Sequence, residues 1–341
     1  MVNMSITIKE IAEKAGVSKA TVSLALNNKG AVSEKTRELI WDIANSNGYN
    51  KKSYTIKKNI LFIKYIGNGA AIEHNGDFVA RVVDAIEFAS RELKYSLTIK
   101  NIEVGEFERE IKYIDFDSFE GVIILATELE ADKGEIIRTI PVPTVAVDNM
   151  FEDHDVDCVV MDNYGGIFSA VRYLYELGHR DIGYIDSHIR FPNFEQRSIG
   201  YERAIRKLGM EYSEENIKFV QPNLEGAYCN MITELESGKR IPSAYVAAND
   251  TIAIGAIKAL REKGYEVPED VSVVGFDNIP FGRVLEKSLT TMHVDKEQLG
   301  ELAVKALNNK IKNKEKGCIK MVTRTKLTVR ESTCPPKAEQ R

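Results

Sequence analysis

The sequence predicts a small all-α head followed by an α/β body that contains two doubly wound parallel-sheet subdomains. Two helix-start signals lie close together within residues 7–27, which is typical of a compact helical hairpin. From Ile60 onward, short apolar runs alternate with amphipathic helical segments, and this is the pattern of the βαβ units that build parallel sheets. The alternation occurs in two successive series. We therefore expect two sheets, each with helices on both faces.

The head has the sequence pattern of a helix-turn-helix. Thr7 and Glu10 have the spacing of a capping box at the start of one helix, and Ser18 can cap a second, short helix. Gly16, between them, suits a tight turn that needs a positive φ. A third helix that begins at Ser33 carries apolar residues on one face and would close the small core. The unit is either an ordinary helical bundle or, as we prefer, a module whose second helix lies in the DNA major groove.

In the body, strand-like segments form two series with helical segments between them. They are residues 60–65, 95–100, 121–125 and 144–147, then 182–185, 217–220, 244–248 and 272–276. The expected helices include 77–94, 196–208 and 225–237. The last segment contains one strand, a long helix over 296–312 and two further strands, and the tail after it is expected to be disordered.

Composition and charge favour a nucleic-acid-binding protein of the cytoplasm. A chain of 341 residues suggests two or three domains, and its net charge of −5 is unevenly distributed. Residues 1–58 contain ten Lys and Arg against five Asp and Glu, so this part carries +5 and the remainder −10. A basic module on an acidic body is typical of a DNA-binding protein, although a solvated charged surface would give the same balance. No apolar run approaches about 18 residues, so we expect no signal sequence and no membrane partner.

Metal and catalytic motifs are absent from the sequence. The four cysteines are widely spaced without a Cys-x-x-Cys pair, which indicates reduced thiols rather than a disulfide framework or a zinc site. The five histidines show no metal-ligand spacing, and neither a phosphate-binding loop nor a Gly-x-Ser-x-Gly elbow occurs. Gly67 and Gly69 begin a dinucleotide fingerprint, but Ile72 stands where its third glycine belongs. We therefore expect neither an enzyme nor a cofactor nor a metal site.

Two stretches of the head carry a family resemblance. AGVSKATVSLALN at residues 15–27, followed by SEKTRELIWDIANSNGY at 33–49, closely resembles the head of the LacI/GalR (lactose-repressor-like) family of bacterial transcriptional regulators. The rest of the chain resembles the same family from Ile60 to about Ser332. The resemblance implies a body of the periplasmic-binding-protein type with a small effector between its subdomains. It also implies a symmetric homodimer on a pseudo-palindromic operator in double-stranded DNA.

The resemblance divides the chain into four regions. These are a DNA-binding head at 1–49, a short basic linker at 50–59, an effector-binding and dimerisation domain at 60–332, and a disordered tail at 333–341. Within the third region the chain is expected to cross back near its end. The first subdomain would comprise about 60–161 plus 291–320, and the second about 162–290 plus 321–332.

The first residues of the second head helix are the expected base-reading residues. Lys19 and Ala20 start that helix, where side chains reach base edges. Leu24, one turn further, departs from the arginine common in the family and would contact thymine methyl groups. Other side chains would hold phosphates, which position the helix without reading sequence. These are Thr7, Ser18, Thr21, Ser23 and Asn27.

The linker NKKSYTIKKN occupies the place of the family's hinge helix, which inserts a leucine into the minor groove. Tyr49 of the hinge motif is present, but its Pro-Asn and Ala-Arg-x-Leu parts are missing and the linker is several residues shorter. Ile56 is the one aliphatic side chain in the linker that could act as the wedge. The linker is therefore either a shortened hinge or a plain tether whose lysines contact phosphates.

Polar residues follow the expected strands at the edge where a ligand would lie. In open α/β sheets, ligands bind beyond the carboxyl ends of the strands, and two facing subdomains form a cleft there. The residues are Thr127, Glu128, Asp148, Asn193, Arg197, Asn249 and Asp277. Such side chains suit a hydroxyl-rich ligand, because Arg and Asp can each hold two hydroxyls, although Asp and Asn also form turns and helix caps at these places.

The family resemblance supports some of these positions more than others. Arg197, Asn249 and Asp277 match the family's effector contacts, whereas Asp250 is as readily a helix cap as a contact. Phe78 lies at a family position that packs on the ligand. Phe194 could also stack on the ligand. Val294 stands where the lactose-repressor branch has a polar side chain, so the resemblance implies no particular sugar.

We predict a sequence-specific DNA-binding transcriptional regulator, a repressor, whose operator affinity is controlled by a small carbohydrate effector. A purine is the alternative effector, because Phe78, Phe191 and Phe194 would allow aromatic stacking around a base. A solute-binding protein would need a secretion signal and no basic head, which is the reverse of this sequence. A sugar-modifying enzyme would need a catalytic dyad that we do not find.

Overall fold

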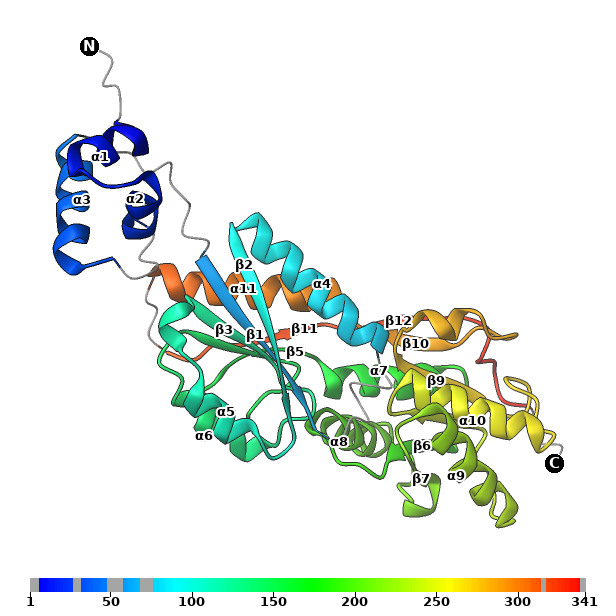
Figure 1. The fold of residues 1–341 in the computed structure, drawn as a ribbon. Coiled ribbons are helices and arrows are strands. Elements are labelled where there is room, and N and C mark those ends of the chain that lie inside the picture. Colours follow the sequence, from blue (N-terminus) through cyan, green and yellow to red (C-terminus); the bar gives the residue numbers. More distant parts are fainter. Residues whose placement is uncertain (1–5, 27–31, 48–57, 68–75, 314–316, 338–341) are drawn as a thin grey trace. The chain divides into compact units, whose positions relative to one another are not determined.

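The computed structural model describes residues 6–26, 32–47, 58–67, 76–313 and 317–337. They belong to two units, one within Met1–Lys57 and the other within Lys58–Arg341. The described part of the first unit is helical, and the second contains two six-stranded sheets (Figure 1). A helical head before an α/β body is the fold class that the sequence predicts.

The head is built of three helices around a small apolar core. They are α1 (Ile8–Ala15), α2 (Lys19–Leu26) and α3 (Glu34–Ser46). The predicted capping box is present, since the N–H of Thr7 donates to Glu10 Oε2 at 2.7 Å and the N–H of Glu10 donates to Thr7 Oγ1 at 3.3 Å. Gly16 ends α1 with a φ of 66°, as the tight turn requires. The core side chains are Ile11, Ala12, Val22, Ala25, Leu26, Ile40 and Ala44.

The first sheet of the body is entirely parallel. Its order is β11-β5-β4-β3-β1-β2, so that the chain starts at β1, forms one edge with β2, and then crosses β1 to build the sheet toward the other edge. The strands are β1 (Lys58–Ile66), β2 (Tyr95–Glu103), β3 (Gly121–Leu125), β4 (Thr144–Val147), β5 (Asp157–Met161) and β11 (Lys320–Thr323). This winding brings the carboxyl ends of β3 and β4 to one edge, beside each other.

Helices cover both faces of the first sheet. They are α4 (Gly76–Glu92), α5 (Phe107–Tyr113), α6 (Gly134–Arg138) and α11 (Lys296–Asn313), with 3₁₀ turns η1 (Phe116–Ser118) and η2 (Ala131–Lys133). Successive residues of β1 alternate between two cores, Ile60 and Phe62 with α4 and α11, and Leu61 and Ile63 with α5 and α6. Gly300 allows α11 to approach α4, because an added Cβ would lie 2.6 Å from the Cβ of Ala85.

The second sheet has the same winding with one exception. Its order is β12-β10-β9-β8-β6-β7, and β12 pairs antiparallel with β10, so this sheet is mixed rather than fully parallel. An antiparallel edge strand on a parallel sheet is common in such folds. The strands are β6 (Ile182–Ser187), β7 (Ile217–Val220), β8 (Ala244–Ala247), β9 (Ser272–Asp277), β10 (Thr290–His293) and β12 (Lys326–Thr328).

Four helices pack on the second sheet in two pairs, α7 with α8 and α9 with α10. They are α7 (Asn163–Glu176), α8 (Pro192–Lys207), α9 (Leu224–Glu236) and α10 (Asp250–Glu262), with 3₁₀ turns η3 (Glu214–Asn216) and η4 (Pro280–Arg283). Helix α8 begins four residues earlier than expected, because Pro192 suits the first helical turn. Asn193 therefore lies on a helix and not in a loop.

The chain passes between the two sheets three times, after β5, after β10 and after β11. Two expected boundaries move accordingly. β10 pairs with β9 in the second sheet, although the sequence-based limits place 291–320 in the first subdomain. β11 pairs with β5 in the first sheet, although the same limits place its last three residues in the second. In both places the strand completes its ladder before the chain crosses.

The expectation of a disordered tail is wrong for residues 333–337. The N–H of Cys334 donates to Ser272 Oγ at 3.0 Å, and the carbonyl of Cys334 lies 2.9 Å from His179 Nε2. The Thr333 and Tyr173 hydroxyls are 2.9 Å apart. These bonds satisfy polar groups of the second subdomain, so the tail is part of its packing. Residues 338–341 lie outside the described residues.

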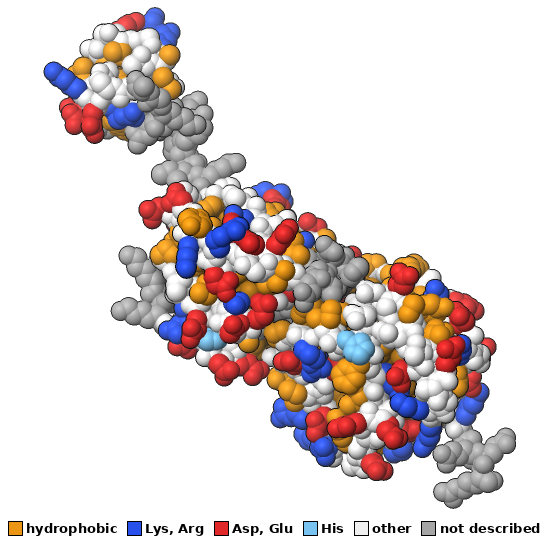
Figure 2. All heavy atoms as spheres, turned by 60° about the horizontal axis from the view of Figure 1, so that its bottom comes forward, with side chains coloured by type: hydrophobic (Ala, Val, Ile, Leu, Met, Phe, Trp, Pro, Cys, Tyr) orange, Lys and Arg blue, Asp and Glu red, His pale blue; other side chains and the backbone are white. Residues whose placement is uncertain are grey.

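The surface of the body carries charge of both signs. Figure 2 shows acidic and basic side chains interspersed over one face of the second unit, without a single basic stripe. All four cysteines are free thiols. Within the described residues, no helix is long and apolar enough to cross a membrane, and no cluster of His, Cys, Asp and Glu could hold a metal ion.

Candidate functional site

In the head, the start of α2 is open to solvent. Lys19 and Ala20 are exposed, and Leu24 keeps 42% of its surface exposed although it is aliphatic. Ser18 holds the helix start, because its Oγ accepts from the N–H of Thr21 at 3.0 Å and the two hydroxyls lie 2.8 Å apart. The exposed face of α2 therefore presents one cation and one aliphatic side chain within its first two turns.

The other expected DNA contacts are placed only in part. Thr7 is exposed, with its hydroxyl donating to Glu10 Oε2 at 2.8 Å, and Ser23 is half-buried on α2. Asn27, Tyr49 and Ile56 lie outside the described residues.

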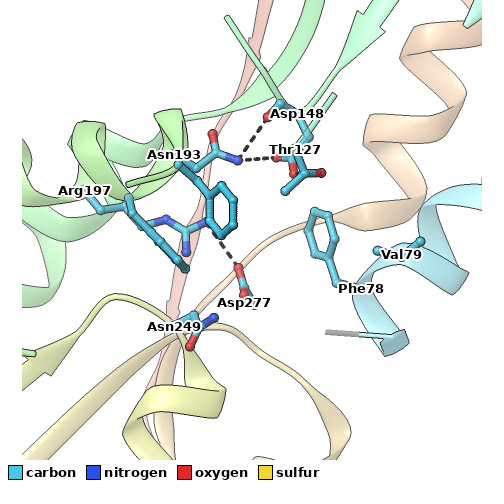
Figure 3. A pocket seen from close by; sticks show the side chains of 10 residues that line it. Phe78, Val79, Thr127, Asp148, Asn193, Arg197, Asn249 and Asp277 are labelled. Atoms are coloured by element: carbon cyan, nitrogen blue, oxygen red, sulfur yellow. Dashed lines mark hydrogen bonds and ion pairs between the residues drawn. The ribbon is translucent and has the colours of Figure 1, made fainter. Parts of the chain in front are cut away.

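The body contains a cavity between its two subdomains. The space in it that a water-sized molecule can occupy is about 30 Å³. Figure 3 shows side chains entering it from α4 and from the ends of β3 and β4 on one side, and from α8 and the second sheet on the other. The lining residues are Phe78, Val79, Thr127, Asp148, Phe191, Asn193, Phe194, Arg197, Asn249 and Asp277.

A hydrogen-bond network crosses this cavity from the first subdomain to the second. Thr127 Oγ1 donates to Asp148 Oδ2 at 2.7 Å, and Asn193 Nδ2 donates to Asp148 Oδ1 at 2.9 Å. Asn163 Nδ2 in turn donates to Asn193 Oδ1 at 2.9 Å, while Asn163 Oδ1 accepts from Arg197 Nε at 2.8 Å. Thr127 is half-buried and the other four members are buried, so the two subdomains are tied together by satisfied polar contacts.

Arg197 connects this network to the second sheet. Its Nη1 donates to the carbonyl of Ala248 at 2.7 Å, and its Nη2 lies 3.4 Å from Asp277 Oδ1. The guanidinium carbon lies 3.8 Å from the centre of the Phe276 ring, which is a stacking distance. Arg197 is only 3% exposed, so its rotamer is held by its partners before any ligand arrives.

The two cavity carboxylates sit on unusual backbone. Asp148 follows β4 with a φ of 69°, and Asp277 ends β9 with a φ of 105°. Residues other than glycine rarely adopt these conformations, and such strain concentrates at binding sites. Each sheet thus turns an aspartate into the cavity at the carboxyl end of a central strand.

Burial changes the acidity of Asp148. Removal from water raises the pKa of its carboxyl to about 6, and this effect is opposed by the hydrogen bond from Thr127, the charge of Arg197 and the hydrogen bond from Asn193. The carboxyl therefore exchanges its proton close to neutral pH.

Asn249 and Asp250 have different roles from those expected of the pair. Asn249 caps α10, because its Oδ1 accepts from the N–H of Ile252 at 2.9 Å, and it also lines the cavity. Asp250 is neither the cap nor part of the lining. Its Oδ1 accepts from the Thr291 hydroxyl at 2.6 Å and its Oδ2 from the N–H of Ile279 at 2.8 Å, so it anchors the segment after β9. Burial, and then the charge of Asp277, raise the pKa of Asp250 to about 7.

Glu128 does not line the cavity. It is 4% exposed and its Oε2 accepts from the N–H of Gly67 at 2.7 Å, so it supports the end of β1. Thr127 and Glu128 are adjacent in the turn after β3, and of the two only Thr127 lines the cavity. The position of Glu128 after a strand could not distinguish these two outcomes.

One lining residue and two supporting residues were not among the sequence-based candidates. Val79 lies beside Phe78 on α4, and Asn163 starts α7. Lys296, the first residue of α11, is 2% exposed and its Nζ donates to the carbonyl of Asp277. Burial lowers the pKa of Lys296. The sequence of α11 has the pattern of a surface helix, so a single lysine at its start gives no indication of such a contact.

Comparison with known proteins identifies the class to which this architecture belongs. Residues 7–51 match the model of bacterial regulatory proteins of the lacI family, and residues 171–333 match the periplasmic binding protein-like domain. The chain is 31% identical over 311 residues to the HTH-type transcriptional repressor PurR of Actinobacillus pleuropneumoniae serotype 3 (strain JL03), with 90% of this chain and 91% of PurR covered.

Solved structures give the same result. The transcriptional regulator CelR in complex with cellobiose has a TM-score of 0.72 and 26% identity, covering 96% of this chain and 99% of CelR. The lac repressor dimer bound to operator and the anti-inducer ONPF has a TM-score of 0.74 at 22% identity, covering 97% and 100%, and is similar in fold. The chain belongs to the LacI/GalR family of bacterial transcriptional regulators. It is a DNA-binding transcriptional repressor with an effector-binding domain.

Proposed function

We propose that the effector of this repressor is a small carbohydrate bound in the cavity between the subdomains. The observation that carries the proposal is the buried set of Arg197, Asp277, Asn249 and Asp148 around one cavity, with Phe78 on the opposite wall. Hydroxyl groups both donate and accept, so they suit a site where carboxylate, amide and guanidinium groups converge. CelR, a relative at 26% identity, was solved with cellobiose, which supports a ligand of this class.

A purine is the second candidate effector. Phe191 and Phe194 have ring centroids 5.7 Å apart, and with Phe78 they make the cavity aromatic on two sides. Aromatic rings stack on the flat faces of bases. The two candidates make different demands on the polar residues, so a binding screen separates them.

Thermal unfolding of the full chain with added compounds tests the proposal. A panel of monosaccharides and disaccharides, including cellobiose, is compared with a panel of nucleobases and nucleosides. A compound present at about 100 times its dissociation constant stabilises the folded state by about 2.7 kcal/mol, which is a measurable rise in melting temperature. Stabilisation by a nucleobase alone would favour the purine, and stabilisation by neither panel would contradict both candidates.

The head is proposed to read DNA through α2. Lys19 and Ala20 would meet base edges, and Leu24 would pack on thymine methyl groups, which explains why an aliphatic side chain remains exposed there. Backbone and hydroxyl groups of Thr7, Ser18, Thr21 and Ser23, and the side chains of Asn27 and Tyr49, would contact phosphates. Ile56 is the candidate minor-groove wedge, or else part of a tether.

The working molecule is proposed to be a homodimer. Phe281 and Val284, three residues apart at η4, are 52% and 73% exposed. Adjacent exposed apolar side chains are typical of an association surface, and a two-fold dimer would place two heads on the half-sites of a pseudo-palindrome.

The regions of the chain would divide this work. Residues 1–49 would bind the operator, 50–59 link the head to the body, and 60–332 bind the effector and the second copy. We place this work in the cytoplasm, because the operator is there, and assign no catalytic role to any residue.

A further inference from the structure

Five ionisable side chains meet at and directly behind the effector cavity, and their charges do not balance. Asp148, Asp250 and Asp277 are carboxylates, whereas Arg197 and Lys296 are cations. Each of the five is at most 3% exposed. With all of them ionised, these five side chains carry one excess negative charge, and the half-buried Arg330 adds a positive charge that acts on Asp250.

The two cations are directed at the second subdomain. Arg197 pairs with Asp277 at 3.4 Å, and Lys296 donates to the carbonyl of Asp277. The charge of Lys296 also acts on Asp250, which lies behind the cavity and anchors the segment after β9. Among the described residues, neither cation therefore forms an ion pair with Asp148, the carboxylate of the first subdomain.

Asp148 is held by neutral donors. Its two oxygens accept from the Thr127 hydroxyl and the Asn193 amide, and among the described residues it forms no ion pair. Arg197 acts on it only as a more distant charge. The segment at 68–75, outside the described residues, reads NGAAIEHN and contains no Lys or Arg, with His74 as its one basic residue.

A buried carboxylate without a cation is costly, and the cost is recovered when a cation binds beside it. Each oxygen of Asp148 accepts one bond from the protein and can accept another. An ammonium group offers three hydrogen-bond donors and a positive charge, whereas a hydroxyl offers one donor and no charge.

We propose that the effector is an amino sugar whose ammonium group pairs with Asp148, while its hydroxyls bind the residues of the second subdomain. The inference rests on the proposed carbohydrate function and narrows it to a cationic class. It also excludes sugar phosphates, because a phosphate would meet Asp148 and Asp277 in a cavity with Arg197 as the one lining cation among the described residues.

Matched ligand pairs test this inference by isothermal titration calorimetry on the full chain at pH 7. Each monosaccharide pair exchanges ammonium for hydroxyl at one carbon: glucosamine and glucose, galactosamine and galactose, mannosamine and mannose. The β-1,4-linked glucosamine dimer is compared with cellobiose, from which it differs by one such exchange in each ring. We expect at least one amino sugar to bind about tenfold or more tightly than its neutral counterpart, because hydrogen bonds to charged groups are the stronger ones. Equal or weaker binding of the amino sugar in every pair that binds would overturn the inference while leaving the carbohydrate proposal intact.

Asp148→Asn provides the variant test. The asparagine keeps the size of the side chain and can exchange hydrogen bonds with Thr127 and Asn193, so we expect it to fold. It should lose the preference for the amino sugar, with the affinity ratio of the pair falling toward one. Asp153→Asn removes an exposed carboxylate nearby and is the matched control, which should keep the ratio. An unchanged ratio in Asp148→Asn would assign the cation to another residue and overturn the proposal.

The pH dependence gives an independent readout. The groups that face Asp148 are Thr127, Asn193, Arg197 and Asp277, with Asp250 and Lys296 behind them. Binding of the amino sugar should weaken below about pH 6 as Asp148 gains a proton, and above about pH 8 as an amine of the α-amino type loses one. The neutral partner should lack the loss on the alkaline side. Failure of every sugar, charged or neutral, would overturn both this inference and the carbohydrate proposal.

Discussion

At the scale of single residues, the cavity is organised by Arg197, which is held by three different elements. It bonds to Asn163 at the start of α7 and to Ala248 after β8, pairs with Asp277 at the end of β9, and stacks on Phe276. Such a side chain is part of the fold as well as of the site. Its loss therefore has two separable effects, one on stability and one on the ligand response.

We expect Arg197→Ala to lower the free energy of unfolding by about 3–5 kcal/mol, because the change leaves a buried carboxylate and two buried acceptors without their partner. Urea unfolding followed by circular dichroism measures this loss. Arg203→Ala is the matched control, since Arg203 is an exposed arginine on the same helix, and it should change stability by about 0.5 kcal/mol or less. A loss for Arg197→Ala as small as that of the control would contradict the role assigned to its contacts.

Asp250 should make stability depend on pH. Its pKa in the folded state, about 7, lies above the ordinary value of 3.8, so the folded state binds the proton more tightly than the unfolded state. The contribution of Asp250 to the free energy of unfolding is therefore present below about pH 4 and is lost as the pH rises toward 7.

Asp250→Asn removes this dependence. Between pH 5 and pH 7, we expect the stability of the wild type relative to Asp250→Asn to fall by about 1–2 kcal/mol. Denaturant unfolding of both proteins at several pH values measures the difference. Asp153→Asn, an exposed carboxylate, should run parallel to the wild type. A difference that stays constant or grows with pH would show that Asp250 is ionised throughout this range.

The sequence supplies the identity of most cavity residues but not their orientation. Thr127, Asp148, Asn249 and Asp277 follow strands, and the winding of the two sheets brings these strand ends to one place. Whether a side chain turns into the cavity depends on the conformation of the turn after the strand, and Glu128 in such a turn is directed to Gly67 instead. Other contacts come from residues whose burial has no sequence signal, such as Lys296.

At the scale of elements, the local sequence predicts helix ends well where a side chain or a glycine caps the helix. The capping box of α1, the Ser18 cap of α2 and the turn at Gly16 all depend on residues within three or four positions of each other. The start of α8 was missed, because Pro192 is compatible with both a loop and a first helical turn. The antiparallel pairing of β12 depends on the third crossing of the chain, and no local pattern reports that crossing.

The exposed face of α2 leads to a prediction on DNA recognition. Lys19→Ala should weaken binding to a duplex selected from random sequence by about 1–3 kcal/mol, and should weaken binding to nonspecific DNA less, because a base contact is lost. Fluorescence anisotropy over a range of salt concentrations measures both affinities. Lys35→Ala, which removes an exposed lysine of α3, is the control and should affect the two duplexes alike. Equal losses for Lys19→Ala would mean that Lys19 contacts phosphate only.

At the scale of the whole molecule, the exposed apolar pair at η4 predicts how two copies associate. Val284→Asp places a charge in the proposed interface. We expect the wild type to sediment as a dimer and this variant as a monomer in analytical ultracentrifugation at micromolar concentration. Val322→Asp is the control, because Val322 is an exposed valine of β11 that lies between Lys320 and Arg324. A dimeric Val284→Asp would place the interface elsewhere.

The pairing of β11 with β5 determines when the first sheet can be completed during synthesis on the ribosome. Lys320 lies opposite Cys158, and Asp157 bonds to Ile319 across 162 residues of chain. A ribosome adds about 5–20 residues per second, so the first sheet waits many seconds for its edge strand and for α11, which covers β3 and β4. During that interval the strands β6 to β10 have already been made. Both sheets receive their last strand late, β11 in the first and β12 in the second, and the apolar face of the first sheet that α11 covers is open to chaperones until α11 has been made.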